Sequence, residues 1–128
     1  MQSTKRRILC VDDNDDTCFM LTHLLAQEGY EARSVGSVTE ALELARKEAF
    51  NLYIIDQWFA QSSGTNLCRR IREFDPNTPI IIYSGTALDS DREGALQVGA
   101  SAFVAKPHIE KLVATIKHFF TGAFEARA

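Results

Sequence analysis

Three carboxylates and one lysine come directly after short apolar runs of the chain. Asp12 and Asp13 follow one run, Asp56 follows a second and Lys106 follows a third. If these runs are parallel strands, all four side chains emerge at one edge of a sheet, where open α/β folds place their ligand sites. Carboxylates gathered there repel one another unless a hard divalent cation lies among them. The spacing therefore predicts a site for Mg²⁺, or Mn²⁺, beside a lysine.

Asp56 is the best candidate for a nucleophile in this group. A carboxylate at a strand end can attack phosphorus in line once a metal ion neutralises the phosphoryl oxygens, and the product is an acyl phosphate. Lys106, followed by Pro107, supplies a point charge for phosphoryl oxygen. Ser84 and Gly85 end a further apolar run and add a hydroxyl and a backbone N–H. Alone, the Asp residues and the Ser84-Gly85 pair would be common turn or cap formers and Lys106 a surface lysine, so the prediction rests on their convergence.

The elements that must position these residues follow the rhythm of βα units, in which short apolar runs alternate with helical periodicity. The third helical stretch carries Leu67, Ile71 and Phe74 at helical spacing, whereas the fourth, at 88–97, is weakened by Gly94. Five strands and five helices fit the chain as one domain. The expected strands are 7–11, 31–35, 52–56, 79–84 and 102–106.

Composition narrows the class of protein. The 128 residues are 45% apolar, which is enough for one buried core. A net charge of −3 argues against a nucleic-acid surface. The sequence shows neither a membrane-spanning apolar stretch nor a signal peptide, so we expect a cytoplasmic protein. Its three cysteines lack metal-site spacing and are expected to be reduced thiols.

In this order and spacing, the residues resemble the receiver domains of bacterial two-component response regulators, and the resemblance covers almost the whole chain. Gly64 also stands where that family usually has a glycine, eight residues after the phosphoacceptor. The positions similar to the family's acidic pair, phosphoacceptor, hydroxyl switch, switch aromatic and lysine are Asp12 and Asp13, Asp56, Ser84, Phe103 and Lys106.

The resemblance implies a flavodoxin-like fold of five βα units, with a doubly wound parallel sheet of order 2-1-3-4-5 and helices on both faces. The receiver domain would cover 1–122, leaving 123–128 as a tail. The resemblance further implies that Asp13, Asp56 and the backbone carbonyl of Trp58 bind Mg²⁺, with Asp12 acting through water. The groups implied to hold the phosphoryl oxygens are Lys106, the Ser84 hydroxyl and the N–H groups of Trp58 and Gly85.

The function implied is a phosphorylation switch. The donor would be a phosphohistidine on a sensor histidine kinase or a histidine phosphotransfer protein, and the domain would catalyse only its own phosphorylation and dephosphorylation. Ser84 and Phe103 would form the switch that alters the interaction surface. That surface, the fourth helix, fifth strand and fifth helix, would bind a downstream protein, an output domain or a second copy of the chain.

Other classes remain open because the stretch 57–63 departs from the family pattern. Phe59 and Ala60 stand where the family commonly has Met-Pro. A receiver-shaped interaction module that works without phosphorylation is the main alternative. A haloacid-dehalogenase-like phosphatase fits less well, because it needs a second Asp where Trp58 stands. A flavodoxin also fits poorly, because the first loop presents four Asp rather than hydroxyls for a phosphate.

Overall fold

A computed structural model describes residues 5–85 and 89–121, so the expected tail at 123–128 and the first residue of the fourth expected helix lie outside the described part. Strands and helices alternate along the chain, as the apolar rhythm predicts. The strands are β1 (Arg7–Val11), β2 (Glu31–Val35), β3 (Leu52–Ile55), β4 (Ile80–Ser84) and β5 (Ala102–Ala105). The helices are α1 (Asp15–Gln27), α2 (Val38–Lys47), α3 (Gly64–Arg72), α4 (Asp89–Gln97) and α5 (Ile109–Phe120).

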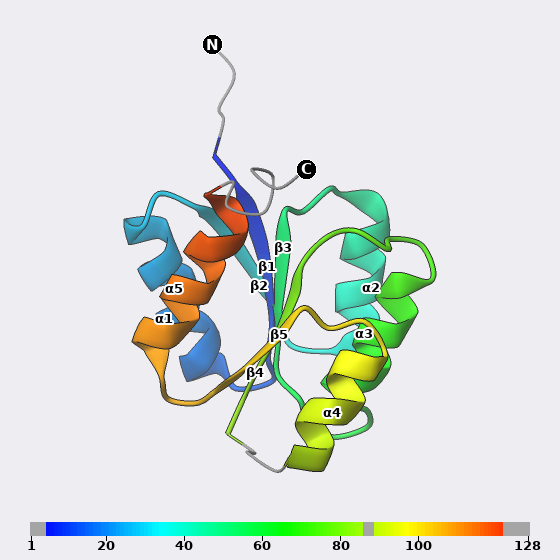
Figure 1. Cartoon of the computed structure of the whole chain (residues 1–128). Coiled ribbons are helices and arrows are strands. Elements are labelled where there is room, and N and C mark those ends of the chain that lie inside the picture. The colour runs from blue at the N-terminus through cyan, green and yellow to red at the C-terminus, as the bar shows by residue number, and fades with distance from the viewer. Residues whose placement is uncertain (1–4, 86–88, 122–128) are drawn as a thin grey trace.

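The five strands form one parallel sheet of order β2-β1-β3-β4-β5, which confirms the expected topology. Helices α1 and α5 cover one face, and α2, α3 and α4 cover the other (Figure 1). The chain reverses its direction of winding between β1 and β3. Open sheets of this kind place their ligand sites at the carboxyl ends of the strands beside that switch point.

The core consists of two apolar layers, one on each side of the sheet. Leu9 and Tyr53 point into the layer under α2, α3 and α4, whereas their neighbours Ile8 and Ile54 point into the layer under α1 and α5. All of these side chains are essentially inaccessible to solvent. Because each large apolar side chain contributes about 1.5–3 kcal/mol on burial, the two layers hold the strand ends firmly in place.

Helix ends match the capping residues of the sequence. The side chains of Asn14, Ser37 and Ser63 accept hydrogen bonds from the first turns of α1, α2 and α3. Gly29 and Gly99 follow α1 and α4 with φ angles of 93° and 109°, a conformation that favours glycine. These caps fix where each loop leaves the sheet and where it enters the next helix.

One residue departs from the expected helix pattern. Phe74 continues the apolar periodicity of the third helix, but α3 ends at Arg72. The guanidinium of Arg72 donates to the carbonyls of Asp75 and Thr78 in the following turn and to that of Gly99 in the loop after α4. These bonds hold the chain in a turn, which places Phe74 beyond the helix.

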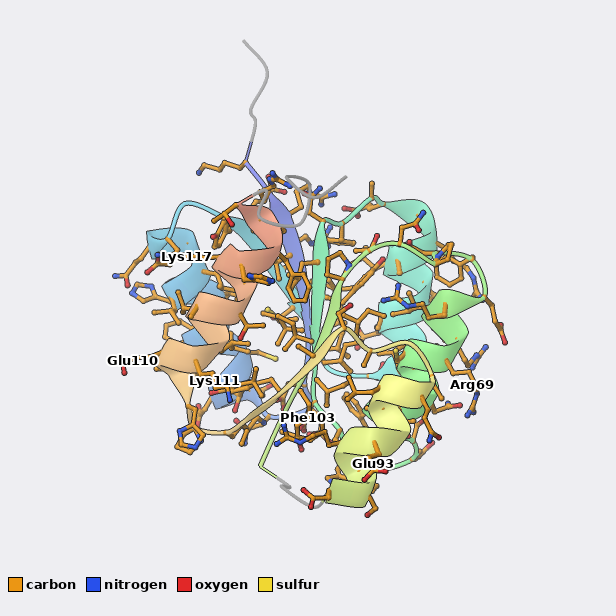
Figure 2. All side chains as sticks on the ribbon, viewed as in Figure 1. Arg69, Glu93, Phe103, Glu110, Lys111 and Lys117 are labelled. Atoms are coloured by element: carbon orange, nitrogen blue, oxygen red, sulfur yellow. The ribbon has the colours of Figure 1, made fainter. Side chains whose placement is uncertain are left out.

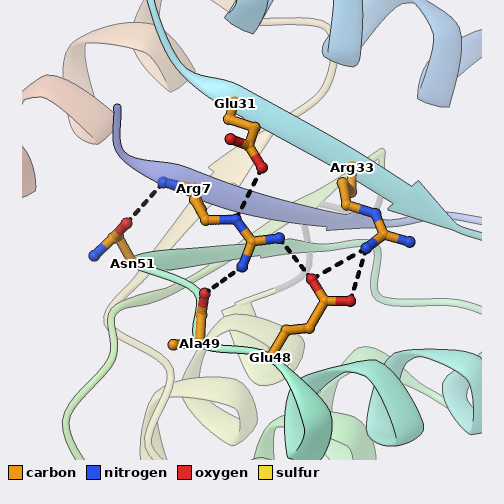
Figure 3. A network of polar contacts seen from close by, with 6 residues as sticks. All are labelled: Arg7, Glu31, Arg33, Glu48, Ala49 and Asn51. Carbon is orange, nitrogen blue, oxygen red and sulfur yellow. Dashed lines mark hydrogen bonds and ion pairs between the residues drawn. The ribbon is translucent and has the colours of Figure 1, made fainter. Parts of the chain in front are cut away.

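A polar network around Arg7 joins the amino ends of the strands (Figure 3). Asp56 lies at the opposite edge of the sheet, directly after the carboxyl end of β3. The Arg7 guanidinium donates to Glu31 (2.9 Å), to Glu48 (2.6 Å) and to the carbonyl of Ala49 (2.8 Å). Arg33 also donates to Glu48. The network ties β1 to β2 and to the segment between α2 and β3.

Cys10 and Cys68 are buried, Cys18 is partly buried, and all three are free thiols, as expected. Burial raises the pKa of the Cys10, Cys18 and Cys68 thiols, which disfavours their reactive thiolate form. None of the described helices is both long and apolar enough to cross a membrane.

Candidate functional site

The carboxyl ends of β1 and β3 bring three carboxylates together. One oxygen from each of Asp12, Asp13 and Asp56 lies within 4.8 Å of the other two. Asp12 is buried, Asp56 is partly buried and Asp13 is exposed, so the group opens to solvent on one side. The structure thus assembles the acidic cluster that the sequence predicts.

Asp12 is held on both of its oxygens. Its Oδ1 accepts a hydrogen bond from the N–H of Asn14 (2.9 Å), and its Oδ2 lies 2.8 Å from Nζ of Lys106. The side chain is only 4% exposed. Both oxygens of Asp12 are therefore engaged, whereas Asp13 is exposed to solvent.

Asp56 is fixed at the end of β3. Its N–H donates to the carbonyl of Val11 (2.9 Å), and its Oδ1 accepts from the N–H of Gln57 (2.9 Å). Burial and the nearby negative charge of Asp12 raise the pKa of the Asp56 carboxyl, although Lys106 acts in the opposite direction. The ionised form of Asp56 therefore carries an electrostatic cost, which a cation would relieve.

Lys106 brings a positive charge to the cluster from the end of β5. Its Nζ lies 3.5 Å from Oδ1 of Asp56 as well as close to Asp12, and its N–H donates to the carbonyl of Ser84 (2.8 Å). Burial alone would lower the pKa of Lys106, but the hydrogen bond to Asp12 and the charge of Asp56 outweigh it and raise the pKa. The side chain therefore stays cationic.

The donor set suits a hard divalent cation. Carboxylate oxygens are the ligands that Mg²⁺ prefers, and Mg²⁺ normally keeps several waters, which the exposed side at Asp13 would admit. Three acids with one lysine also leave a net negative charge. The residues present therefore fit such an ion.

The loop between β3 and α3 folds back on itself through backbone pairing between its two ends. Trp58 and Ser63 form an isolated antiparallel bridge, and the N–H of Phe59 donates to the carbonyl of Ser62 (3.1 Å). Trp58 is half exposed, whereas Phe59 packs against the core layer under α2 and α3. The loop is thus ordered although Phe59 is followed by alanine rather than proline.

Gly64 is required by close packing against the phosphoacceptor candidate. A Cβ atom at this position would lie 2.2 Å from the carbonyl oxygen of Asp56 and 3.1 Å from the Cα of Gln57. Real side chains do not tolerate the first distance. The first turn of α3 therefore lies directly against the backbone of Asp56, which explains the spacing of eight residues.

Three further residues of the predicted site, Ser84, Gly85 and Phe103, belong to β4 or β5 or directly follow β4. Ser84 is buried at the last position of β4, and Gly85 follows it and is exposed. Phe103, labelled in Figure 2, is only 6% exposed. It belongs to the same buried apolar cluster as Ala95 of α4. The Arg92 guanidinium lies 5.2 Å from the centre of the Phe103 ring. Phe103 is thus already placed between the sheet and α4.

A family model for the response regulator receiver domain matches residues 8–117. The chain belongs to this family. The transcriptional regulatory protein YkoG of Bacillus subtilis is 32% identical over 114 residues, which make up 88% of this chain and 50% of YkoG. The chain spans about half the length of the curated relatives that it matches.

Solved receiver structures share the fold. A CheY-like response regulator receiver domain protein from Methanospirillum hungatei has a TM-score of 0.86 at 29% identity, and the match covers 90% of this chain and 93% of that one. The response regulator protein TrrA of Thermotoga maritima, solved in complex with Mg²⁺ and BeF, has a TM-score of 0.81 at 27% identity. That match covers 89% of this receiver domain and 98% of the TrrA chain.

Sequence reasoning did not anticipate two features of the site. The buried side chain of Gln57 accepts two hydrogen bonds from Thr65. In addition, a cleft of about 520 Å³ lies beside Asp13, with Phe59 and Arg70 among its walls. Both depend on how the loop after β3 folds against α3. The sequence carries no local signal for either feature beyond the position of Gln57 directly after Asp56.

Proposed function

We propose that this receiver domain is a phosphorylation switch in which Asp56 accepts a phosphoryl group from a phosphohistidine. The observation that carries the proposal is the arrangement of Asp12, Asp13 and Asp56 around one point, with Lys106 in contact with two of them. Such an arrangement can position a metal ion and a nucleophile together. It has no evident value for stability, because its acids repel one another.

Each group has a proposed role in phosphoryl transfer. Among the described residues, the two contacts to the Asp56 carboxylate fall on Oδ1, so we assign Oδ2 as the attacking oxygen. A bond forms between this oxygen and phosphorus as the bond from phosphorus to the donor imidazole breaks. The electron pair of the broken bond stays on that ring nitrogen, so the imidazole, which carries a proton on its other nitrogen, leaves as the neutral ring. Lys106 and the Ser84 hydroxyl, with the N–H groups of Trp58 and Gly85, hold the phosphoryl oxygens.

We assign Asp13, Asp56 and the backbone carbonyl of Trp58 as direct Mg²⁺ ligands, with Asp12 acting through water. Mn²⁺ has the same preference for oxygen and would serve as well. When bound, the ion neutralises charge on the phosphoryl oxygens. Support comes from the fit of the donor set and from TrrA, which was solved with Mg²⁺ and BeF.

The partners follow from the family. A sensor histidine kinase or a histidine phosphotransfer protein would donate the phosphoryl group, in the cytoplasm. Because YkoG is a transcriptional regulatory protein about twice as long, an output domain or a separate downstream protein would receive the signal. We assign residues 1–122 to the receiver domain and α4, β5 and α5 to the responding face, where a second copy could also bind. The domain itself would act on no other substrate.

Incubation with acetyl phosphate and Mg²⁺, followed by mass spectrometry of the intact protein, tests the proposal. One phosphoryl group should be added to the parent and none to Asp56→Asn. Asp13→Asn and Lys106→Ala should slow the reaction, whereas Asp16→Asn, which removes an exposed acid from the first turn of α1, should not. If Asp56→Asn is phosphorylated like the parent, the assignment of the nucleophile is wrong.

A further inference from the structure

The residue after the phosphoacceptor candidate has an unusual environment. Gln57 is the second residue after the fully apolar strand β3 and is polar, yet it is only 3% exposed. Its Oε1 accepts hydrogen bonds from both the N–H (2.9 Å) and the hydroxyl (3.0 Å) of Thr65. A buried amide is costly unless its polar atoms are paired, so this contact must hold the two residues together.

Gln57 also accepts hydrogen bonds from backbone N–H groups in the first turn of α3 that have no partner within the helix. The N–H groups of the cap residue and of the first three helical residues lack partners within the helix. Here the N–H of Gly64 donates to the carbonyl of Gln57 (2.7 Å), that of Thr65 to the Gln57 side chain, and that of Asn66 to Ser63 Oγ (3.0 Å). Gln57 therefore accepts two of the three, in addition to the conventional cap at Ser63.

Gln57 also touches Asp56, because its own N–H donates to Asp56 Oδ1 (2.9 Å). One residue thus joins the phosphoacceptor candidate to the first turn of α3. Trp58 comes next, and its pairing with Ser63 attaches the other side of the loop to the same helix end. The stretch 57–63 contains no proline that could stiffen it, so these hydrogen bonds restrain it together with the packing of Phe59 against the core.

We propose that Gln57 is a positioning residue of the acidic site, whose buried side chain fixes the backbone of Trp58 by anchoring the loop to α3. The inference rests on the proposed function, since that assigns the Trp58 carbonyl to the metal. Residues that orient ligands without touching the ion typically change metal affinity by about 10–100-fold when replaced. Gln57 should therefore control the affinity for Mg²⁺ even in unphosphorylated protein.

Calorimetric titration of the metal-free protein with Mg²⁺ tests this, and emission from Trp58, the only tryptophan, gives a second signal. Gln57→Met keeps the shape of the side chain but removes the acceptor, so it should weaken binding by at least ~10-fold. Gln57→Glu keeps an acceptor for Thr65 and should bind Mg²⁺ no more weakly than the parent. Gln61→Met makes the same replacement at an exposed position of the same loop and should have no effect.

The outcomes separate the inference from the proposed function. If Gln57→Met binds like the parent, or if Gln57→Glu is as weak as Gln57→Met, the positioning role is wrong. Should Gln57→Met fail to fold, Thr65→Val decides, because it removes only the hydroxyl donor and should still weaken binding. Unchanged binding in that variant also overturns the inference. A parent that binds Mg²⁺ no better than Asp13→Asn contradicts the proposed function itself, on which the inference rests.

Discussion

Nζ of Lys106 lies 2.8 Å from Oδ2 of Asp12, nearer than the 3.5 Å that separates it from Oδ1 of Asp56. The lysine is therefore held mainly by the buried acid that we do not assign as a direct metal ligand. This arrangement keeps a cation next to Asp56, the proposed nucleophile, without neutralising it fully. Asp12 thus has two tasks, since it adds negative charge to the site and also fixes the position of Lys106.

The pairing of Lys106 with Asp12 should appear in the stability of the metal-free protein. Lys106→Met leaves a buried carboxylate without its cation and should lower the free energy of unfolding. The same change in an Asp12→Asn background should cost less, with a coupling energy of about 0.5–3 kcal/mol for groups in direct contact. Urea unfolding of the four proteins measures this energy, and strictly additive effects would show that the pair is not coupled.

The pH dependence of stability should carry the signature of Asp56. Its pKa is raised above the ordinary value of 3.8, so the folded state binds the proton more tightly than the unfolded state does. The resulting stabilisation is present at low pH and is lost as the pH rises through the raised pKa. Asp56→Asn should therefore unfold at a higher temperature than the parent at pH 7 without divalent ions, with the gap narrowing toward pH 4. An equal difference in unfolding temperature at pH 7 and at pH 4 would contradict the raised pKa of Asp56.

Most of the fold was predictable because burial on both faces leaves a clear mark on the sequence. β1 and β2 have the expected bounds, and β3 and β5 end one residue early, at Ile55 and Ala105. The N–H groups of Asp56 and Lys106 still bond to the neighbouring strands, so the patterns of β3 and β5 differ from the ladder only in their last residue. β4 begins one residue later than expected, at Ile80. The periodicity placed Phe74 in the third helix. It carries no information about the hydrogen bonds from the Arg72 guanidinium to the carbonyls of the following turn, which accompany the end of α3 at Arg72.

The site was predictable where it depends on strand ends, since topology alone gathers Asp12, Asp13, Asp56 and Lys106. Contacts made by the loop after β3 were not predictable. The pairing of Gln57 with Thr65 spans eight residues and requires a hairpin that no local turn signal announces. The closer partnership of Lys106 with Asp12 was also hidden, because it depends on ångström differences between two nearby acids.

The close approach of α3 to Asp56 gives a sharp test with a matched control. Gly64→Ala places a methyl group against the Asp56 carbonyl and should destabilise the protein by about 1–3 kcal/mol. Gly94→Ala, within α4, meets no atom within 4 Å and should stabilise it by about 0.5–1 kcal/mol. Thermal unfolding of both variants gives these values. Equal effects of the two would mean that α3 does not press on Asp56.

The network around Arg7 should contribute more to the stability of the protein than its number of ion pairs suggests. Arg7 binds two carboxylates and a carbonyl and lies over the Phe50 ring, whereas Arg33 has Glu48 alone among the ion pairs of the described residues. Arg7→Met should therefore lower the urea midpoint clearly more than Arg33→Met. High salt should reduce the loss of stability in Arg7→Met only in part, because the hydrogen bond from Arg7 to the carbonyl of Ala49 is not an ion pair. Equal urea midpoints for Arg7→Met and Arg33→Met would show that the additional contacts of Arg7 add little to stability.

Ser84 and Phe103 are the residues through which we propose that phosphorylation reaches α4. Ser84 is buried at the end of β4, next to β5, which carries Phe103 under Arg92. A phosphoryl oxygen offers the Ser84 hydroxyl a strong acceptor, which would draw it toward Asp56 and free space beneath α4. Repacking a buried aromatic ring involves on the order of 1.5–3 kcal/mol, comparable to the gap between two conformations of a switch.

This relay predicts that a change at Asp56 spreads along α4 and β5. With beryllofluoride and Mg²⁺ as the phosphoryl mimic, amide chemical shifts should change between Asp89 and Ala105 as well as beside Asp56. In Ser84→Ala, which lacks the hydroxyl, the distant changes should be much smaller although the mimic still binds. Titration of both proteins by two-dimensional NMR makes the comparison. Changes confined to the neighbours of Asp56 in the parent would mean that Phe103 is ordinary core.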